Sequence, residues 1–148
     1  MYLILICVVG LLVLLFGFFR IRLLRRRREL EEHSIEADAL HELLENNQDI
    51  LLFDVRQPLD LLAHSEIIPG AKRLPPKEVM EQASLIPKEK DSVIYCTCVS
   101  QSTSRMVLEQ ALKLNFTKIK FLKGGLDAWK AKGYPVERYT TPFHLDTA

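Results

Sequence analysis

The most apolar segment of the chain is its beginning, residues 1–19, which contain no charged side chain. A helix of this length rises about 28 Å, close to the roughly 30 Å thickness of the hydrocarbon core of a bilayer. Because backbone polar groups in lipid must be satisfied within the segment, a helix is the expected form. A cleaved signal peptide is the alternative, but it normally begins with positive charge and ends at a small-residue site. Here the positive charge follows the apolar run, so the pattern predicts an uncleaved transmembrane helix over residues 1–19.

Charge dominates the next segment, residues 20–33. Its six arginines are Arg20, Arg22, Arg25, Arg26, Arg27 and Arg28. Glutamates follow the last arginines at a spacing of four, which pairs side chains on a helix, so the segment is predicted to continue the helix as a basic stalk. Positive charge beside a membrane helix marks its cytoplasmic side, which predicts an N-terminus outside and a cytoplasmic domain. We therefore expect a single-pass protein of a bacterial inner membrane, with residues 1–28 contacting the bilayer and its anionic headgroups.

Beyond the stalk, short apolar runs alternate with stretches of helical periodicity. The predicted strands are 50–53, 71–74, 92–96 and 118–122, and the predicted helices are 34–45, 77–83, 104–114 and 126–132. Ser34 is the expected N-cap of the first helix. Strands that are apolar on both faces are typical of a parallel sheet covered on both sides. The alternation predicts an α/β domain over residues 34–137, with a small, mainly parallel central sheet, helices on both faces and a tail over residues 138–148.

The composition of the chain narrows the range of functions expected for this domain. Six of the 20 basic residues lie in the stalk, which leaves 14 against 19 acidic residues from Glu29 onward. Nucleic acid is bound mainly through cationic side chains, so it is not an expected partner of an acidic domain. The three cysteines are too few for a disulfide scaffold, and Cys7 lies in the apolar segment. Cys96 and Cys98 are therefore the candidate functional thiols.

Both of these cysteines fall between a predicted strand and a predicted helix. In open α/β sheets the functional crevice lies beyond the carboxyl ends of the strands, where this segment is expected. A thiol there meets backbone N–H groups and the positive end of the helix dipole, which favour the reactive thiolate. The alternative is that these cysteines are small buried hydrophobes. The residues predicted to bind an anionic substrate beside the thiol are Val99, Ser100, Gln101, Ser102, Thr103, Ser104 and Arg105.

Three sequence signatures resemble those of the rhodanese family. They are D-V-R within Leu52–Arg56, I-P-G-A at Ile68–Ala71, and L-x-G-G-x-x-A-W at Leu122–Trp129, which is followed by G-Y-P-V at Gly133–Val136. The resemblance implies a rhodanese-like fold and a sulfurtransferase activity. One cysteine would take sulfane sulfur from a donor such as thiosulfate, become a persulfide, and pass the sulfur to a thiophilic acceptor such as cyanide or the thiol of a small molecule or protein. The resemblance implies no metal or organic cofactor.

Most residues of these signatures are expected to support the scaffold. Asp54 and Arg56 are predicted to form an architectural charge pair, and Trp129 is predicted to pack against the sheet. Gly124 and Gly125 are expected to adopt backbone conformations with φ > 0. The histidines His33, His41, His64 and His144 lack the spacing of a metal site.

Two cysteines compete for the catalytic position that the family places after a strand. Counting forward from the strand favours Cys96, whereas counting back from the paired glycines through the helix favours Cys98. Cys98 is the preferred prediction, because the N-terminus of the helix is what activates the thiolate. Cys96 would then lie on the same face of an extended chain as a packed or resolving thiol. The loop departs from the family in having no glycine and no arginine before Arg105.

Three other functions remain as alternatives. A cysteine-dependent phosphatase needs C-x5-R, but Arg105 follows Cys98 after six residues and Cys96 after eight. A thiol–disulfide protein would use Cys96 and Cys98 as its redox pair. The third alternative is a catalytically silent rhodanese-like module that recruits a protein partner to the membrane.

Overall fold

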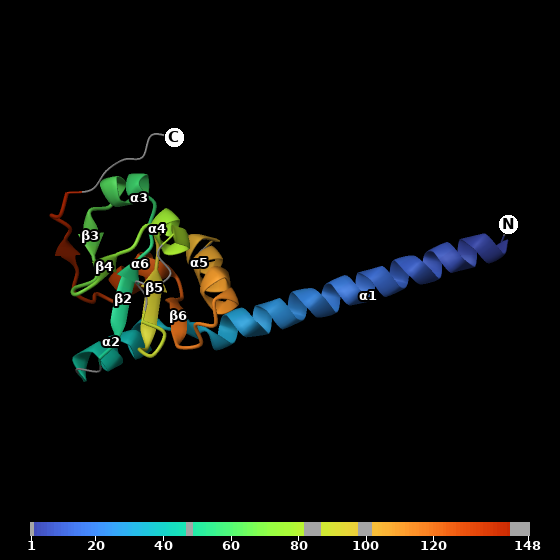
Figure 1. The fold of residues 1–148 in the computed structure, drawn as a ribbon, viewed down its shortest axis with the longest axis horizontal. Coiled ribbons are helices and arrows are strands. Elements are labelled where there is room, and N and C mark those ends of the chain that lie inside the picture. The colour runs from blue at the N-terminus through green and yellow to red at the C-terminus, as the bar shows by residue number, and fades with distance from the viewer. Residues whose placement is uncertain (1, 47–48, 82–86, 98–101, 143–148) are drawn as a thin grey trace. The chain divides into compact units, whose positions relative to one another are not determined.

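The computed structural model of the chain describes residues 2–46, 49–81, 87–97 and 102–142 (Figure 1). It divides into two compact units, Met1–His33 and Ser34–Ala148. Each unit is described by itself.

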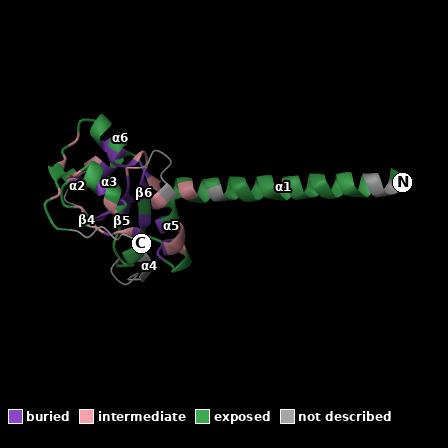
Figure 2. Ribbon diagram, turned by 90° about the horizontal axis from the view of Figure 1, so that it is seen from above, coloured by how far each residue is buried: buried purple, intermediate pink, exposed green. Residues whose placement is uncertain are grey.

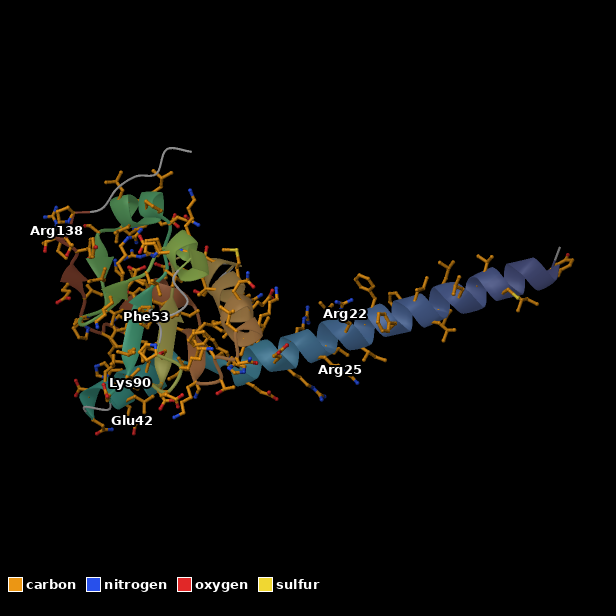
Figure 3. All side chains as sticks on the ribbon, in the orientation of Figure 1. Arg22, Arg25, Glu42, Phe53, Lys90 and Arg138 are labelled. Carbon is orange, nitrogen blue, oxygen red and sulfur yellow. The ribbon has the colours of Figure 1, made fainter. Side chains whose placement is uncertain are left out.

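The first unit is one helix, α1 (Tyr2–Glu32), of 31 residues. Such a helix is about 46 Å long, which exceeds the hydrocarbon thickness of a bilayer. The helix therefore continues beyond the apolar residues and includes the arginine segment. Its described apolar side chains up to Leu24 are exposed on every side, Phe19 at 74% and Leu14 at 72% among them (Figure 2). Figure 3 shows Arg22 and Arg25 pointing to different sides of the helix. Within the described part of the chain, this is the one helix long and apolar enough to cross a membrane.

The second unit is built on a five-stranded sheet in the order β1-β6-β5-β2-β4, in which every pairing is parallel. Its strands are β1 (Ser34–Ile35), β2 (Leu51–Asp54), β4 (Lys72–Arg73), β5 (Ser92–Tyr95) and β6 (Ile119–Leu122). The apolar runs form the centre: all four residues of β5 are buried, because the strand lies between β2 and β6 and is covered on both faces. The predicted mainly parallel sheet is confirmed.

Helices cover both faces of this sheet. They are α2 (Ala37–Glu45), α3 (Pro58–Ala63), α4 (Pro76–Glu81), α5 (Ser102–Lys113) and α6 (Gly125–Ala131). Figure 2 shows α2 and α6 on one side of the strands and α4 and α5 on the other. The α2–α6 side has a continuous core that includes Leu40, Leu126, Val93 and Tyr95. Side chains alternate along a strand, so Ile94 and the residue after β5, Cys96, face the α4–α5 side.

Several short elements differ from the prediction. Ser34 is not an N-cap: it pairs with Phe121 as the first residue of β1, and α2 begins at Ala37 with Glu36 as its N-cap. The segment before Ile68, for which no helix or strand is predicted, contains α3 and a strand, β3 (Glu66–Ile67). That strand pairs antiparallel with β7 (Glu137–Arg138), so the pairing reaches the first residue of the predicted tail. Strands of two residues are too short to show a period, and their pairings join distant parts of the chain.

Candidate functional site

The candidate site lies at the carboxyl edge of the sheet, where β5 ends and α5 begins (Figure 1). Cys96 and Thr97 follow β5, and α5 begins at Ser102. Because α5 returns the chain so that β6 can run parallel to β5, its N-terminus lies at the carboxyl edge. The sequence therefore brings a cysteine segment to the positive end of a helix of 12 residues. Four predicted site residues, Cys98, Val99, Ser100 and Gln101, lie outside the described residues.

Cys96 is held in the interior at this edge. Its side chain is buried, with a relative exposure of 1%. Its carbonyl oxygen accepts a hydrogen bond of 2.9 Å from the backbone N–H of Leu126, at the start of α6. The approach is close enough that a Cβ added to Gly125 would lie 1.9 Å from the same carbonyl oxygen. The backbone at the end of β5 is thus fixed by α6 directly before the cysteine loop.

The paired glycines make that contact geometrically possible. Gly124 has φ +69° and Gly125 has φ +57°, so both lie in the left-handed region, as predicted from the sequence. Trp129, one turn further along α6, is buried, and its indole N–H donates 2.8 Å to the carbonyl oxygen of Pro135. Its ring lies 5.0 Å from that of Tyr134. The residues of the C-terminal signature therefore pack α6 against the sheet and place its start in contact with the backbone of Cys96.

The charge pair at the end of β2 is also internal. Arg56 is fully buried, and its guanidinium NH2 lies 2.5 Å from a carboxylate oxygen of Asp54. Its Nε donates to both oxygens of the same carboxylate at 2.9 Å. Its NH1 and NH2 groups also donate to backbone carbonyls, 2.7 Å to His64 and 2.8 Å to Glu66. The arginine therefore ties β2 to the end of α3 and to the start of β3, and the expected pairing is present.

Tyr95, the last residue of β5, interacts with residues of two sequence signatures, Ile68 of I-P-G-A and Asp54 of D-V-R. Its hydroxyl accepts a hydrogen bond of 3.2 Å from the backbone N–H of Ile68. Burial raises the pKa of Tyr95 far above its ordinary value, and the nearby Asp54 carboxylate raises it further. The phenol therefore remains protonated beside the buried pair. Sequence reasoning missed this role, although a hydroxyl inside an apolar strand was the available signal, because a buried hydroxyl needs a partner.

The first turn of α5 carries the described part of the predicted substrate-binding segment. Arg105, its one cation, is exposed, and Thr103 is partly buried. Ser104 is fully buried. The structure therefore places the hydroxyl of Ser104, and not the guanidinium of Arg105, against the interior of the site. Within the described ranges, no group of three or more His, Cys, Asp or Glu side chains is placed to hold a metal ion.

Comparison with protein families decides what this scaffold is. The Rhodanese-like domain family model matches residues 36–132. The chain belongs to the rhodanese family. A curated relative, "Sulfurtransferase" of Allochromatium vinosum, is 31% identical over 104 residues, which cover 70% of this chain and 94% of that protein. A second, "Thiosulfate sulfurtransferase/rhodanese-like domain-containing protein 3" of Mus musculus, is 31% identical over 96 residues, 57% of this chain and 60% of that protein.

Solved structures agree on the rhodanese fold. A rhodanese-related protein of Thermoplasma volcanium is 27% identical with a TM-score of 0.58, covering 71% of this chain and 97% of that one. A rhodanese-like domain of an Anabaena protein is 27% identical with a TM-score of 0.61, covering 78% and 89%. A Lactobacillus plantarum protein, 23% identical with a TM-score of 0.68 over 82% and 98%, matches in fold. Family and relatives together support a sulfurtransferase-type role for this rhodanese domain.

Proposed function

We propose that this protein is a membrane-anchored sulfurtransferase that carries sulfane sulfur as a persulfide on Cys98. The observation that carries the proposal is the placement of the cysteine segment between the carboxyl end of β5 and the N-terminus of α5. There, helix amides and the helix dipole favour a thiolate over a thiol. The rhodanese scaffold beneath it is complete in its described parts, with Asp54–Arg56 and Gly124–Gly125 in place.

The reaction proceeds in two displacements at sulfur. The thiolate attacks the outer sulfur of thiosulfate or of an organic persulfide. The donor's S–S bond breaks, sulfite or a thiolate leaves with the bonding electron pair, and the enzyme cysteine becomes a persulfide anion. The acceptor, cyanide or a thiolate, then attacks the terminal sulfur, and the enzyme thiolate leaves. The net change is the transfer of one neutral sulfur atom, and neither step needs an oxidant, a reductant or a metal.

The burial of Cys96 supports Cys98 as the nucleophile. A nucleophilic sulfur must reach a donor molecule, and the Cys96 side chain is 1% exposed. The Cys96 carbonyl is also held by α6, which fixes the residue as part of the core. A buried cysteine of this kind behaves as a small hydrophobe. Cys96 therefore serves packing in this proposal.

Sulfur loading tests the proposal directly. The full chain, purified in detergent, should gain the mass of one sulfur atom when treated with thiosulfate or a low-molecular-weight persulfide, and should lose it to cyanide. Cys98→Ser should abolish the gain, and Cys96→Ser should retain most of it. Intact-protein mass spectrometry measures both. A gain of sulfur that persists in Cys98→Ser but is lost in Cys96→Ser would move the nucleophile to Cys96.

A silent rhodanese-like module is the second candidate function. The observation that favours it is the exposure of Arg105, which leaves the described turn of α5 without an inward-facing cation to hold an anionic donor. If the wild-type chain gains no sulfur from either donor while its domain remains folded, the silent binding module replaces the sulfurtransferase as the proposed function.

We further propose that α1 anchors the domain on the cytoplasmic side of a bacterial inner membrane. The described apolar side chains of α1 up to Leu24 are exposed all round, as suits a helix surrounded by lipid, and the arginines follow the apolar run. A reporter that is active only in the cytoplasm, fused after Ala148, should be active. A reporter that requires export should be inactive at the same position. The opposite pair of results would reverse the topology, and release of the fusion into the soluble fraction would exclude the anchor.

A further inference from the structure

An open groove runs along one side of α1. Its volume is about 640 Å³, within the range of roughly 300–1,000 Å³ that is typical of small-molecule sites. Positions three and four apart lie on the same side of a helix, and the lining follows that spacing along α1. The lining side chains include Val9, Leu12, Phe16, Phe19, Arg20 and Leu23. Among the lining residues, Arg20 is the one that carries a charge.

Arg20 is the first charged residue after the apolar run, and its side chain turns back toward that run. Its guanidinium carbon lies 5.8 Å from the centre of the Phe16 ring, four residues earlier in the helix. A cation at this distance over an aromatic face is attracted by the ring. Helical side chains also lean toward the N-terminus, which favours the same direction. The groove therefore combines an apolar floor with one cation near its polar end.

The length of the groove fits one acyl chain of a phospholipid. From Val9 to Arg20 the helix rises about 16 Å, close to the roughly 15 Å of hydrocarbon in one leaflet of a bilayer. The phosphate of a phospholipid lies at the end of its acyl chains, at the level of the first charged residue of a membrane helix. A guanidinium binds a phosphate through two parallel N–H···O bonds. Length and charge together select a lipid with a net negative headgroup.

A second copy of α1 is a less suitable occupant of the groove. Two copies insert in the same direction, so a paired copy would place its arginines beside those of the first. Arg20 would lie against its own counterpart, and five more arginines follow by Arg28. Like charges at this distance repel, whereas anionic headgroups neutralise them.

We propose that this groove binds one anionic phospholipid, with an acyl chain along residues 9–19 and the phosphate on the Arg20 guanidinium. The inference rests on the proposed membrane anchor and is independent of sulfur transfer. It goes beyond a general attraction of the arginine segment for anionic headgroups, because it assigns the contact to one arginine and to one side of the helix.

Native mass spectrometry of the full chain tests the site. The chain is reconstituted with equal amounts of phosphatidylglycerol and phosphatidylcholine that carry the same acyl chains, and the lipids that remain bound are counted. The wild type should retain one phosphatidylglycerol in preference to phosphatidylcholine. Arg20→Gln should lower that retention about fivefold, the effect of one basic residue near an anionic surface. Arg25→Gln is the matched control, because Arg25 is exposed, lies about 140° around the helix from Arg20 and is not among the described residues that line the groove.

A pair of phenylalanine substitutions tests the apolar part of the groove. Phe16 and Phe18 are exposed to a similar extent, 68% and 62%, but of the two it is Phe16 that lines the groove and contacts Arg20. Phe16→Leu should lower the retention of phosphatidylglycerol about two- to fivefold, because the ring that holds the cation is lost. Phe18→Leu should leave the retention unchanged.

Flotation with phosphatidylglycerol vesicles separates the lipid site from the anchor. All of these variants should float, because the apolar segment keeps its length. A wild-type chain that does not float would overturn the anchor and the lipid site together. In a chain that floats, equal retention of the two lipids, or equal losses in Arg20→Gln and Arg25→Gln, would overturn the lipid site alone. A lipid-free dimer would assign the groove to a second copy and would overturn the site as well.

Discussion

Replacing Asp54 with alanine is expected to lower the free energy of unfolding of the domain by about 3–5 kcal/mol, because it leaves a buried guanidinium without a counter-charge. Arg56 is fully buried and has three contacts with the Asp54 carboxylate through Nε and NH2. The carbonyl oxygens of His64 and Glu66 would remain as partners, but they carry no net charge. The loss is a large share of the stability of a typical domain, about 5–15 kcal/mol.

Urea unfolding in detergent measures this effect on the full chain. Trp129 is the one tryptophan in the sequence and is buried in the domain, so its fluorescence reports domain unfolding separately from α1. Asp49→Ala is the matched control: it also removes an aspartate from an ion pair, with Lys90, but the two side chains are 75% and 46% exposed. An exposed pair contributes about 0–1 kcal/mol. If Asp54→Ala were as mild as Asp49→Ala, the buried pair would not support the scaffold.

Asp54→Asn separates charge from hydrogen bonding at the same position. The amide keeps an oxygen that accepts from Arg56 but supplies no negative charge. We expect a loss of stability between that of the wild type and that of Asp54→Ala, since hydrogen bonds to a charged group are the stronger kind.

The central sheet and its charge pair could be predicted from the sequence because their signals are local. The run Leu51–Phe53 is apolar at every position, which a strand covered on both faces requires. Asp54 and Arg56 are separated by one residue at the end of that strand, close enough to pair. The two further acceptors of Arg56 could not be predicted, because they depend on how the chain from His64 to Glu66 folds back over β2.

The short elements were missed for a different reason. β1, β3 and β7 have two residues each, and what makes them strands is a pairing with a distant segment. Ser34 illustrates the error: a serine before an apolar helix is a common N-cap, yet here its backbone pairs with β6 and Glu36 takes the cap position. The choice between Cys96 and Cys98 stays a prediction, supported by the burial of Cys96. It depends on loop geometry, which the sequence alone does not specify.

Gly125→Ala is expected to lower the free energy of unfolding by about 2–5 kcal/mol and to abolish sulfur loading of Cys98. Two effects add. An alanine at φ +57° is in the left-handed region, at a cost of about 1–2 kcal/mol. Its Cβ would also lie 1.9 Å from the carbonyl oxygen of Cys96, so the start of α6 must move away. That movement breaks the bond from Leu126 N–H to the Cys96 carbonyl, and a buried group left unpaired costs about 1–3 kcal/mol.

Gly133→Ala isolates the conformational part of this effect. Gly133 has φ +74°, but nothing lies within 4 Å of an added Cβ, so only the cost of the left-handed backbone, about 1–2 kcal/mol, is expected. Urea unfolding followed by Trp129 fluorescence gives both stabilities, and mass spectrometry gives sulfur loading of the folded fraction. Gly133→Ala should load sulfur normally, because it leaves the Cys96 backbone in place. Equal losses of stability in the two variants would mean that α6 does not hold Cys96. Normal loading in folded Gly125→Ala would mean that the cysteine loop does not need this support.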